Sequence, residues 1–248
     1  MYIKLKLKSE NCNAKSNEFL FGLPSAFVAH SFVHNILRTL DIKNKKRGVA
    51  ISYLRQDSYR NNSSYFLKRS ADRRKKLDGE TILETPTQSI EVILIFNIDV
   101  VVNSNEDLLI LGKNIRSVAM KNRFAGGFIR DVEIDIKENI EDFGRVLGFF
   151  EHTSNEVYDN AVDMIFKTSY ISGGIKAPSI IGYYDLSERD KEHSFFNRNG
   201  VDHVFGEAII GTHKFESIKE KLTDEMFDNI AFKTEYKNKK LKIKNRGI

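Results

Sequence analysis

The order of strand-like and helix-like patterns in the first 136 residues constrains the fold more than any other feature of this sequence. Residues 2–8 alternate apolar and basic side chains, which is the period of a half-buried strand with a cationic outer face. A helical pattern follows from Phe27 to Leu40, then strand patterns over 48–54 and 89–102, a helix opened by Asn105-Glu106-Asp107, and a strand over 128–136. The order β-α-β-β-α-β predicts an α+β protein with a ferredoxin-like (RRM-like) core.

Turn signals separate these elements. The sequence predicts a polar turn at Asn11-Cys12-Asn13-Ala14, a helix start at Gly22-Leu23-Pro24-Ser25 with Pro24 near the first turn, a loop from Asn44 to Arg47, and a stop or bend at Ala125-Gly126-Gly127. The run over 89–102 is the most β-prone in the chain, and we expect it to form a central strand.

The pattern changes after residue 136. It predicts helices over Ile140–Phe150 and Glu156–Thr168, an extended Gly173–Tyr184 segment, a loop around Ser187–Gly200, a strand over His203–Gly211 and a last helix from Phe215. No Pro-, Gly- or Ser-rich linker divides the chain. We therefore expect one compact body, with a core over 1–136 and a C-terminal α/β half over 137–248 packed on it.

Basic residues gather in two blocks. Residues 43–76 hold twelve Lys and Arg against two acidic residues, although the whole chain carries only +5. A second block, from Lys233 to Arg246, holds seven basic residues and one acidic residue. Such clusters attract a polyanion, because neutralised phosphates release counterions. The alternative is a solvated face and a frayed tail, whereas an anionic membrane is disfavoured because neither block has the spaced apolar residues of an interfacial helix.

The first basic block includes a stretch, residues 55–80, that has no periodic apolar face. We interpret it as a thumb-like excursion from the core. Guanidinium planes bind phosphates and stack on bases, and aromatic rings stack on unpaired bases. The RNA-binding candidates in it are Arg55, Arg60, Arg69, Arg73, Arg74, Lys75, Tyr59 and Tyr65, with Lys76 and Phe66 beside them. A surface loop with local aromatic packing is the alternative.

A second group of RNA-binding candidates surrounds the glycine turn. A turn without side chains lets backbone amides approach a phosphate closely. The candidates are Arg123, Gly126 and Gly127, flanked by Lys121 and Arg130. The sequence lacks the Gly-Lys-Ser/Thr ending of a Walker loop, and a plain helix-ending turn is the alternative.

Metal and cofactor sites are not expected. His30 and His34 lie four apart on the first predicted helix, but no acid or cysteine stands at supporting spacing. We keep His34 as a possible RNA contact. The single cysteine, Cys12, excludes an internal disulfide, and no apolar run approaches the length of a membrane span. We expect a cytoplasmic protein.

Six short segments, taken in order, resemble one family. They are Asn11-Cys12-Asn13-Ala14, Gly22-Leu23-Pro24-Ser25, Phe32-Val33-His34-Asn35-Ile36-Leu37-Arg38, Arg123-Phe124-Ala125-Gly126-Gly127, Ala177-Pro178-Ser179-Ile180-Ile181-Gly182-Tyr183 and His203-Val204-Phe205-Gly206-Glu207. Together they resemble the type I-F CRISPR Csy-two proteins, the Cas-five-f subunit of the Csy (Cascade) surveillance complex. The chain departs from that family in being shorter and in having no tryptophan.

The resemblance implies a non-catalytic subunit with a ferredoxin-like fold and a protruding thumb. Such a subunit grips the 5′ handle of the CRISPR RNA, pairs with the large subunit and abuts the first backbone subunit in antiviral defence. We place the thumb at the basic excursion from its spacing and charge. The sequence leaves open whether the chain also contacts target DNA.

Two other functions remain open. One is a CRISPR-RNA-processing endoribonuclease of ferredoxin-like fold, in which His30 or His34 is the general base towards a ribose 2′-hydroxyl. The other is a generic RNA-binding module, which shares the charge pattern but not the order of the six segments.

Overall fold

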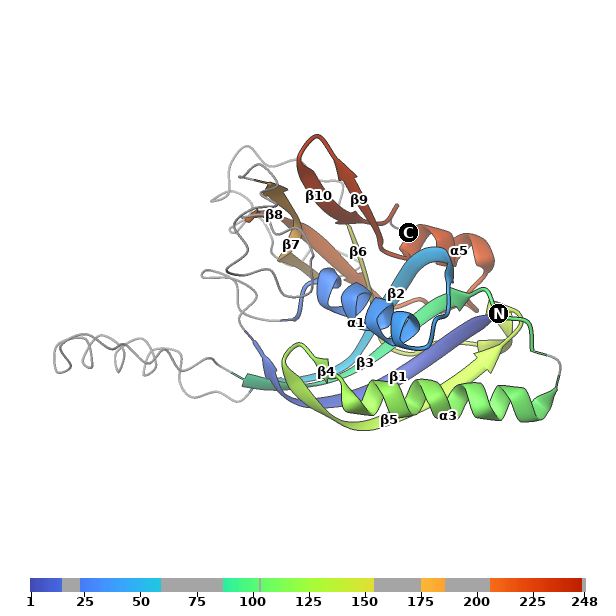
Figure 1. The fold of residues 1–248 in the computed structure, drawn as a ribbon. Helices are drawn as coiled ribbons and strands as arrows, with labels where there is room; N and C mark the ends of the chain where they lie inside the picture. Colours follow the sequence, from blue (N-terminus) through green and yellow to red (C-terminus); the bar gives the residue numbers. More distant parts are fainter. Residues whose placement is uncertain (15–22, 59–86, 103, 154–174, 186–205, 247–248) are drawn as a thin grey trace, which may run out of the picture.

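The computed structural model describes residues 1–14, 23–58, 87–102, 104–153, 175–185 and 206–246 (Figure 1). The elements in chain order are β1 (Tyr2–Asn13), α1 (Ala26–Thr39), β2 (Asn44–Ser58), β3 (Thr87–Ile98), α3 (Asn105–Lys121), β4 (Arg123–Phe124), β5 (Gly127–Lys137), the 3-10 helix η1 (Ile140–Phe143), β6 (Phe149–Thr153), β7 (Ile175–Asp185), β8 (Gly206–Glu216), α5 (Asp224–Ile230), β9 (Lys233–Lys237) and β10 (Lys240–Lys244). The fold is α+β, with few helices and a mostly antiparallel sheet.

The strands form one ten-stranded sheet in the order β4-β5-β1-β3-β2-β6-β8-β7-β10-β9. The pairings between neighbouring strands are antiparallel. The predicted central strand is confirmed, because β3 lies between β1 and β2. Helices α1 and α3 lie on the same face of the N-terminal strands (Figure 1). The two edges of the sheet are the β4–β5 hairpin and the β9–β10 hairpin.

The alternating residues of β1 explain its place between two strands. Ile3, Leu5 and Leu7 are fully buried on the helix-covered face. The lysines between them point to the other face, as predicted, and meet acids on neighbouring strands: Lys4 Nζ lies 2.9 Å from Asp135 and Lys6 Nζ lies 3.0 Å from Glu133. The cationic stripe of β1 is therefore paired within the sheet.

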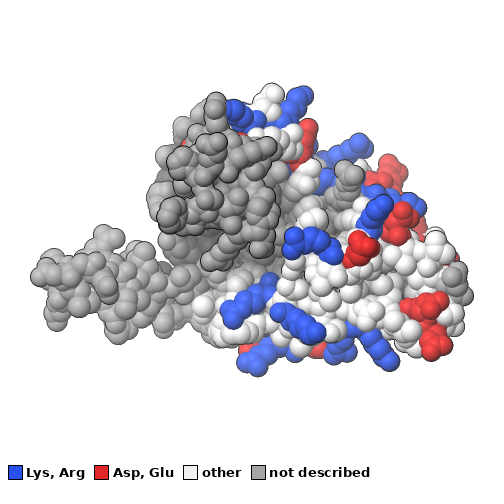
Figure 2. Space-filling model, in the orientation of Figure 1, with Lys and Arg blue, Asp and Glu red and all other residues white. Residues whose placement is uncertain are grey.

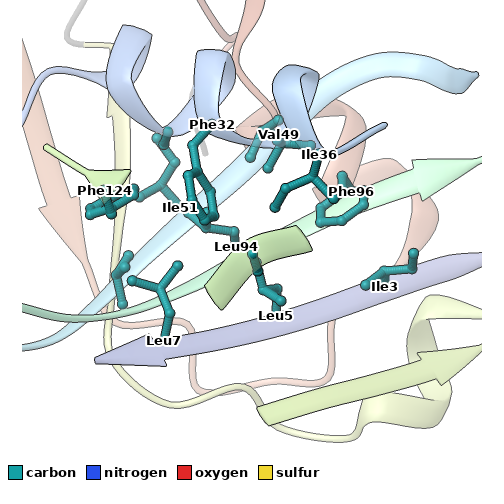
Figure 3. Packing of buried hydrophobic residues seen from close by; sticks show 14 of the residues in the cluster. Ile3, Leu5, Leu7, Phe32, Ile36, Val49, Ile51, Leu94, Phe96 and Phe124 are labelled. Carbon is teal, nitrogen blue, oxygen red and sulfur yellow. The ribbon is translucent and has the colours of Figure 1, made fainter. Parts of the chain in front are cut away.

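The main core lies between α1 and the N-terminal strands. Phe32 and Ile36 of α1 point onto Ile51 and Leu94 of the sheet (Figure 3). Fully burying a side chain of this size contributes about 1.5–3 kcal/mol. This packing fixes α1, and with it the start of the helix, relative to β1, β2 and β3.

A second apolar cluster closes the opposite face of the sheet. Tyr2, Ile93 and Ile95 of the central strands pack with residues that follow β5, namely Ile140, Phe143, Val146, Phe150, Ile218, Leu222, Phe227 and Ile230. The Tyr2 hydroxyl also donates to Asp224 at the start of α5. The middle of this face is thus buried.

Two predicted connections in the N-terminal half are wrong. The predicted turn at Asn11-Cys12-Asn13 continues β1, with an irregular register between Ser9 and Cys12. Asn11 adopts a left-handed conformation (φ 56°), which asparagine tolerates, so the polar residues form a bulge instead of a turn. The predicted loop from Asn44 to Arg47 is the start of β2, which pairs with β3 at Ile98.

Smaller boundary differences also occur in this half. Pro24 precedes the N-cap residue Ser25 instead of lying in the first turn of α1. Residues 55–58, the expected start of the excursion, continue β2.

Two helices predicted in the C-terminal half are also wrong. Over Ile140–Phe150 the chain forms only η1 and then β6, because Gly144 (φ 64°) and Gly148 (φ 102°) interrupt the helical pattern. Phe215 lies in β8, and the helix comes later as α5, capped by the Thr223 side chain. The second basic block is the β9–β10 hairpin instead of a frayed tail.

The other predicted elements of the C-terminal half either match the structure or fall outside the described residues. The extended segment near Tyr184 is β7 and the strand near Gly211 is β8. The predicted helix over Glu156–Thr168 and the loop around Ser187–Gly200 lie outside the described residues. Within the described ranges, no helix has the length and apolar character needed to cross a membrane.

Candidate nucleic-acid interface

A cavity of about 530 Å³ opens between the start of α1, the β4–β5 hairpin and β7. Its lining residues are Asn13, Pro24, Ser25, Phe27, Val28, Ser31, Phe32, Asn35, Asn122, Arg123, Ala125, Gly126 and Tyr183. We call it the α1–hairpin cleft. It combines aromatic rings, side-chain amides, one guanidinium and a backbone turn.

The aromatic wall of the cleft comes from three elements. The rings of Phe27 and Tyr183 lie 5.3 Å apart at an interplanar angle of 59°. Behind them Phe32 packs edge-on against Phe124, with ring centroids 5.5 Å apart. Burial raises the pKa of the Tyr183 phenol above its ordinary value, so its hydroxyl stays protonated at neutral pH. Tyr183 therefore offers a flat apolar surface together with a hydrogen-bonding group.

The β4–β5 hairpin is held tightly against β1. Its two turn residues, Ala125 (φ 50°) and Gly126 (φ 79°), are both left-handed, and Asn13 N donates to Ala125 O at 2.8 Å. A Cβ on Gly127 would lie 2.4 Å from Glu10 O, so only glycine fits there. Gly127 is thus explained by contact with β1, whereas Gly126 is exposed at the turn.

Arg123 lies at the rim of the cleft in a defined position. Its Nη1 donates to Gly126 O at 3.3 Å, and its guanidinium carbon lies 4.4 Å from the centroid of the Phe128 ring. A guanidinium carries five N–H donors, so this arrangement leaves donors available for an anion. Stacking on Phe128 orients the plane of the group, as bidentate phosphate binding requires.

The amide wall of the cleft is a short hydrogen-bonded chain between α1 and α3. Asn35 Nδ2 donates to Asn122 Oδ1 at 2.8 Å, and Asn122 Nδ2 donates to Val118 O at 2.9 Å. Arg38 Nη2 donates to Asn35 Oδ1 at 3.4 Å. Side-chain amides present a donor and an acceptor side by side, which is how proteins read the edges of unpaired bases.

The predicted site residues divide into three groups. Arg123 and Gly126 line the cleft, and Gly127 lies in the same hairpin. His34, Lys121, Arg130 and Arg55 are exposed but do not line it. Arg130 pairs with Glu10 at 2.7 Å and Arg55 with Asp57 at 2.6 Å. The remaining candidates, Tyr59, Arg60, Tyr65, Phe66, Arg69, Arg73, Arg74, Lys75 and Lys76, lie outside the described residues.

Sequence reasoning missed most residues of the cleft as site residues, among them Phe27, Asn35, Asn122 and Tyr183. Asn35 and Tyr183 fall inside the family-like segments, which was the only available signal for them. Phe27 belonged to the predicted apolar face of the first helix. Asn122 carried no signal, because its role depends on α3 ending beside α1.

Five of the six family-like segments meet at this cleft. They contribute Asn13, Pro24 with Ser25, Phe32 with Asn35, Arg123 with Gly126, and Tyr183. The sixth segment enters the described part of the chain at Gly206 and Glu207, and Glu207 pairs with Tyr184 next to Tyr183. Segments far apart in sequence are therefore gathered around one opening.

Charge is unevenly distributed on the face that carries α1, α3 and the hairpin. Acidic residues occupy the first turn of α3 and a lysine occupies its last turn, beside the cleft. Figure 2 shows basic side chains over the hairpin and the later part of α3, and acidic side chains where α3 begins. The end of α3 nearest the cleft is thus the more favourable end for a polyanion.

Comparison with known proteins points to one family. No curated protein matches the sequence. A solved structure described as the crystal structure of a CRISPR protein from Archaeoglobus fulgidus is similar over 99% of this chain and 100% of its own, at 10% identity and a TM-score of 0.29. The family model described as CRISPR-associated protein (Cas_Csy2) matches residues 3–145, which is more than half of the chain. The chain therefore belongs to the CRISPR-associated Cas_Csy2 family.

Proposed function

We propose that this CRISPR-associated protein is a non-catalytic subunit of a type I-F RNA-guided surveillance complex and binds the 5′ handle of the CRISPR RNA. In this proposal it works in the cytoplasm, beside the large subunit and a backbone subunit. Family membership supports the CRISPR assignment. The convergence of five family-like segments on the α1–hairpin cleft is the observation that carries the RNA-binding proposal.

The proposal includes a ferredoxin-like core over residues 1–136. The four strands of that region lie in the order β5-β1-β3-β2 with antiparallel neighbours. Helices α1 and α3 cover one face of these strands (Figure 1). This strand order and one-sided helix cover support the assignment.

The opposite sheet face is a poor candidate for the RNA site. Many RNA-binding domains of this topology stack bases on the exposed face of their sheet. Here Ile93 and Ile95 on that face are buried under the second apolar cluster, and Lys4 and Lys6 are paired with acids. We therefore place the RNA at the rim, in the α1–hairpin cleft.

The chemistry of the cleft suits a single-stranded nucleotide. In the proposed arrangement one base stacks against the Tyr183 and Phe27 rings, and the amides of Asn35 and Asn122 meet its edge. Arg123 binds a neighbouring phosphate. A base stacked on an aromatic side chain contributes about 1–3 kcal/mol, so we expect stacking to supply the largest share of the binding free energy at this cleft.

The basic excursion remains part of the proposal as the thumb. Its candidates begin at the end of β2 with the exposed Arg55. Reversing the charges over residues 55–76 should weaken RNA binding and flatten its dependence on salt, since fewer counterions are released. Unchanged affinity of the charge-reversed chain would exclude the thumb.

The experiment that tests the cleft compares two variants of one residue. Tyr183→Ala removes the stacking ring and Tyr183→Phe keeps it, so only the first should lose affinity for the host's repeat RNA. We expect about a tenfold loss or more, measured by fluorescence anisotropy on the full chain. Arg123→Ala should also weaken binding. Arg145→Ala is the matched control, because Arg145 is an exposed arginine that lies outside both α3 and the cleft.

Two results would decide against this proposal. The cleft is not the RNA site if Tyr183→Ala binds repeat RNA as tightly as the unchanged chain while both unfold at the same urea concentration. The subunit assignment is wrong if native mass spectrometry of the tagged chain from its own host shows neither a guide RNA nor a large partner protein.

The non-catalytic part of the proposal has its own test. Repeat RNA incubated with the full chain should stay intact. Site-specific cleavage that disappears in His30→Ala or His34→Ala and needs no metal would instead support the endoribonuclease alternative.

A further inference from the structure

The second basic block of the sequence folds into a ribbon with one lysine-covered face. In the β9–β10 pairing, Lys240 lies opposite Lys237, Lys242 opposite Glu235 and Lys244 opposite Lys233. Directly opposed residues of an antiparallel pair share one face of the sheet. Lys233, Lys237, Lys240, Lys242 and Lys244 therefore share one face, which we call the lysine face.

Few acids offset the charge of this face. Glu235 is the only acid on it within β9 and β10, and its carboxylate lies 2.6 Å from Lys244 Nζ. Lys233 Nζ lies 3.9 Å from Asp228 of α5. In the described part of the chain Lys237 and Lys242 are exposed and form no ion pair. The face thus carries more positive than negative charge, and two of its five lysines lie outside any ion pair among the described residues.

The ribbon is anchored by its other face. Ile243 is buried in the main core, and Leu241 pairs with Tyr183 of β7. The hairpin turn is tied to β7 by the bond from Asp185 N to Lys239 O at 2.8 Å. The lysines are thereby held on a fixed backbone. Alternate residues of a strand face opposite ways, so they point away from the side of Tyr183 and the cleft.

We propose that the lysine face binds the phosphate backbone of a double-helical nucleic acid without reading its sequence. This site is separate from the cleft and does not depend on the function proposed for it. Lysines two residues apart on a strand are about 6.8 Å apart, similar to the spacing of neighbouring phosphates along one strand. A double helix has a higher charge density than a single strand and therefore releases more counterions to a compact cationic patch.

The composition of the face favours a double helix over a single strand. Single-strand binding surfaces combine cations with aromatic rings on which bases stack. Among the described residues of β7, β9 and β10, the ring on this face is Tyr184, which pairs with Lys240, and the Lys240 ammonium lies over it, 4.7 Å from the ring centroid. The exposed ring of Tyr236 lies on the other face, opposite Leu241. Among the described residues, therefore, this face offers charge without an open stacking surface.

The test uses the full chain and two fluorescein-labelled 24-base-pair helices of mixed sequence, one of DNA and one of RNA. The variant is Lys237→Gln with Lys240→Gln and Lys242→Gln. The control removes the same charge elsewhere, with Lys43→Gln, Lys113→Gln and Lys219→Gln, all exposed positions outside the ribbon. Anisotropy titrations at several salt concentrations give the affinity and its salt dependence, and urea unfolding shows that both variants fold.

We expect the ribbon variant to bind at least one of the two helices about tenfold or more weakly at low salt. The slope of log affinity against log salt should fall by about 2.7, for three lost phosphate contacts. The control should change neither quantity to that extent. A loss confined to the DNA helix would identify DNA as the natural ligand, and a loss confined to the RNA helix would identify structured RNA.

Two outcomes would overturn the proposal. One is an equal salt slope for the ribbon variant and the control on both helices. The other is a ribbon variant that loses only single-stranded RNA or only an acidic partner protein, with binding to both helices intact. Because Tyr183→Ala reports on the cleft through repeat RNA alone, failure of the cleft and failure of the lysine face give different results.

Discussion

The hairpins at the two edges of the sheet use the same turn geometry for opposite purposes. Ala125 and Gly126 close β4–β5, and Asn238 and Lys239 close β9–β10, each with two consecutive left-handed residues. The first hairpin is packed against β1 and α1 and lines a cavity. The second is exposed and covered with lysines. The β4–β5 edge of the sheet therefore forms part of a cavity, and the β9–β10 edge forms a positively charged surface.

The comparison also shows two ways to protect the edge of a sheet. An exposed edge strand invites pairing with another chain, and short strands or lysines discourage it. β4 has only two residues, whereas β9 carries a lysine at each end. The lysines that protect β9 also leave a charged surface available for binding. The short β4 protects its edge in a different way and leaves space for the α1–hairpin cleft.

The largest expected effect concerns how tightly the first hairpin is packed against β1. Gly127→Ala places a Cβ 2.4 Å from Glu10 O and 2.7 Å from Cys12 Sγ, so we expect it to lower the free energy of unfolding by about 3 kcal/mol. Gly126→Ala meets no atom within 4 Å and should cost only about 1 kcal/mol, from its left-handed φ. Urea unfolding measures both. Equal losses would show that the first hairpin is no more tightly packed than an exposed turn.

A smaller effect tests whether the two turns are equivalent. Lys239 (φ 56°) and Ala125 (φ 50°) both hold a conformation that favours glycine. Lys239→Gly and Ala125→Gly should each raise the free energy of unfolding by up to about 1 kcal/mol, read as a higher urea midpoint. If only one of the two substitutions raises the urea midpoint, the two turns do not carry the same backbone strain.

The smallest effect concerns the middle of the sheet, away from both edges. His152 of β6 is buried, with Nε2 3.1 Å from Glu216 Oε2, and burial lowers its pKa below the ordinary value despite that carboxylate. As the pH falls below about 6.5, the unfolded chain takes up the proton before the folded chain does, so stability decreases. The urea midpoint from pH 8 to pH 5 should fall more steeply for the unchanged chain than for His152→Gln. Parallel curves would show that His152 contributes nothing.

Much of the N-terminal half could be predicted from the sequence because its patterns are long and regular. The alternation of β1, the apolar run of β3 and the helical faces of α1 and α3 each determine an element without help from the rest of the chain. The errors occurred where tertiary contact outweighed local composition. Asn11-Cys12-Asn13 looks like a turn, yet Cys12 is buried against the β4–β5 hairpin and keeps the segment in β1.

The C-terminal half was harder to predict because its glycines and lysines carry ambiguous signals. Gly144 and Gly148 break what otherwise resembles a helical pattern after residue 140. The alternation of lysines with Leu241 and Ile243 is a strand period, but the density of charge hides it. The amide wall of the cleft escaped prediction for a different reason, since the approach of Asn35 to Asn122 is set by the packing of α1 beside α3.

The contact between the second residue and the last helix has a consequence for synthesis. The Tyr2 ring packs edge-on against Phe227, and its hydroxyl donates to Asp224, 222 positions along the chain. A ribosome adding 5–20 residues per second makes that partner roughly 10–45 s after Tyr2. Until then the part of the second apolar face that Phe227 and Ile230 cover in the folded protein stays exposed on the nascent chain, and exposed apolar surface of this kind promotes aggregation.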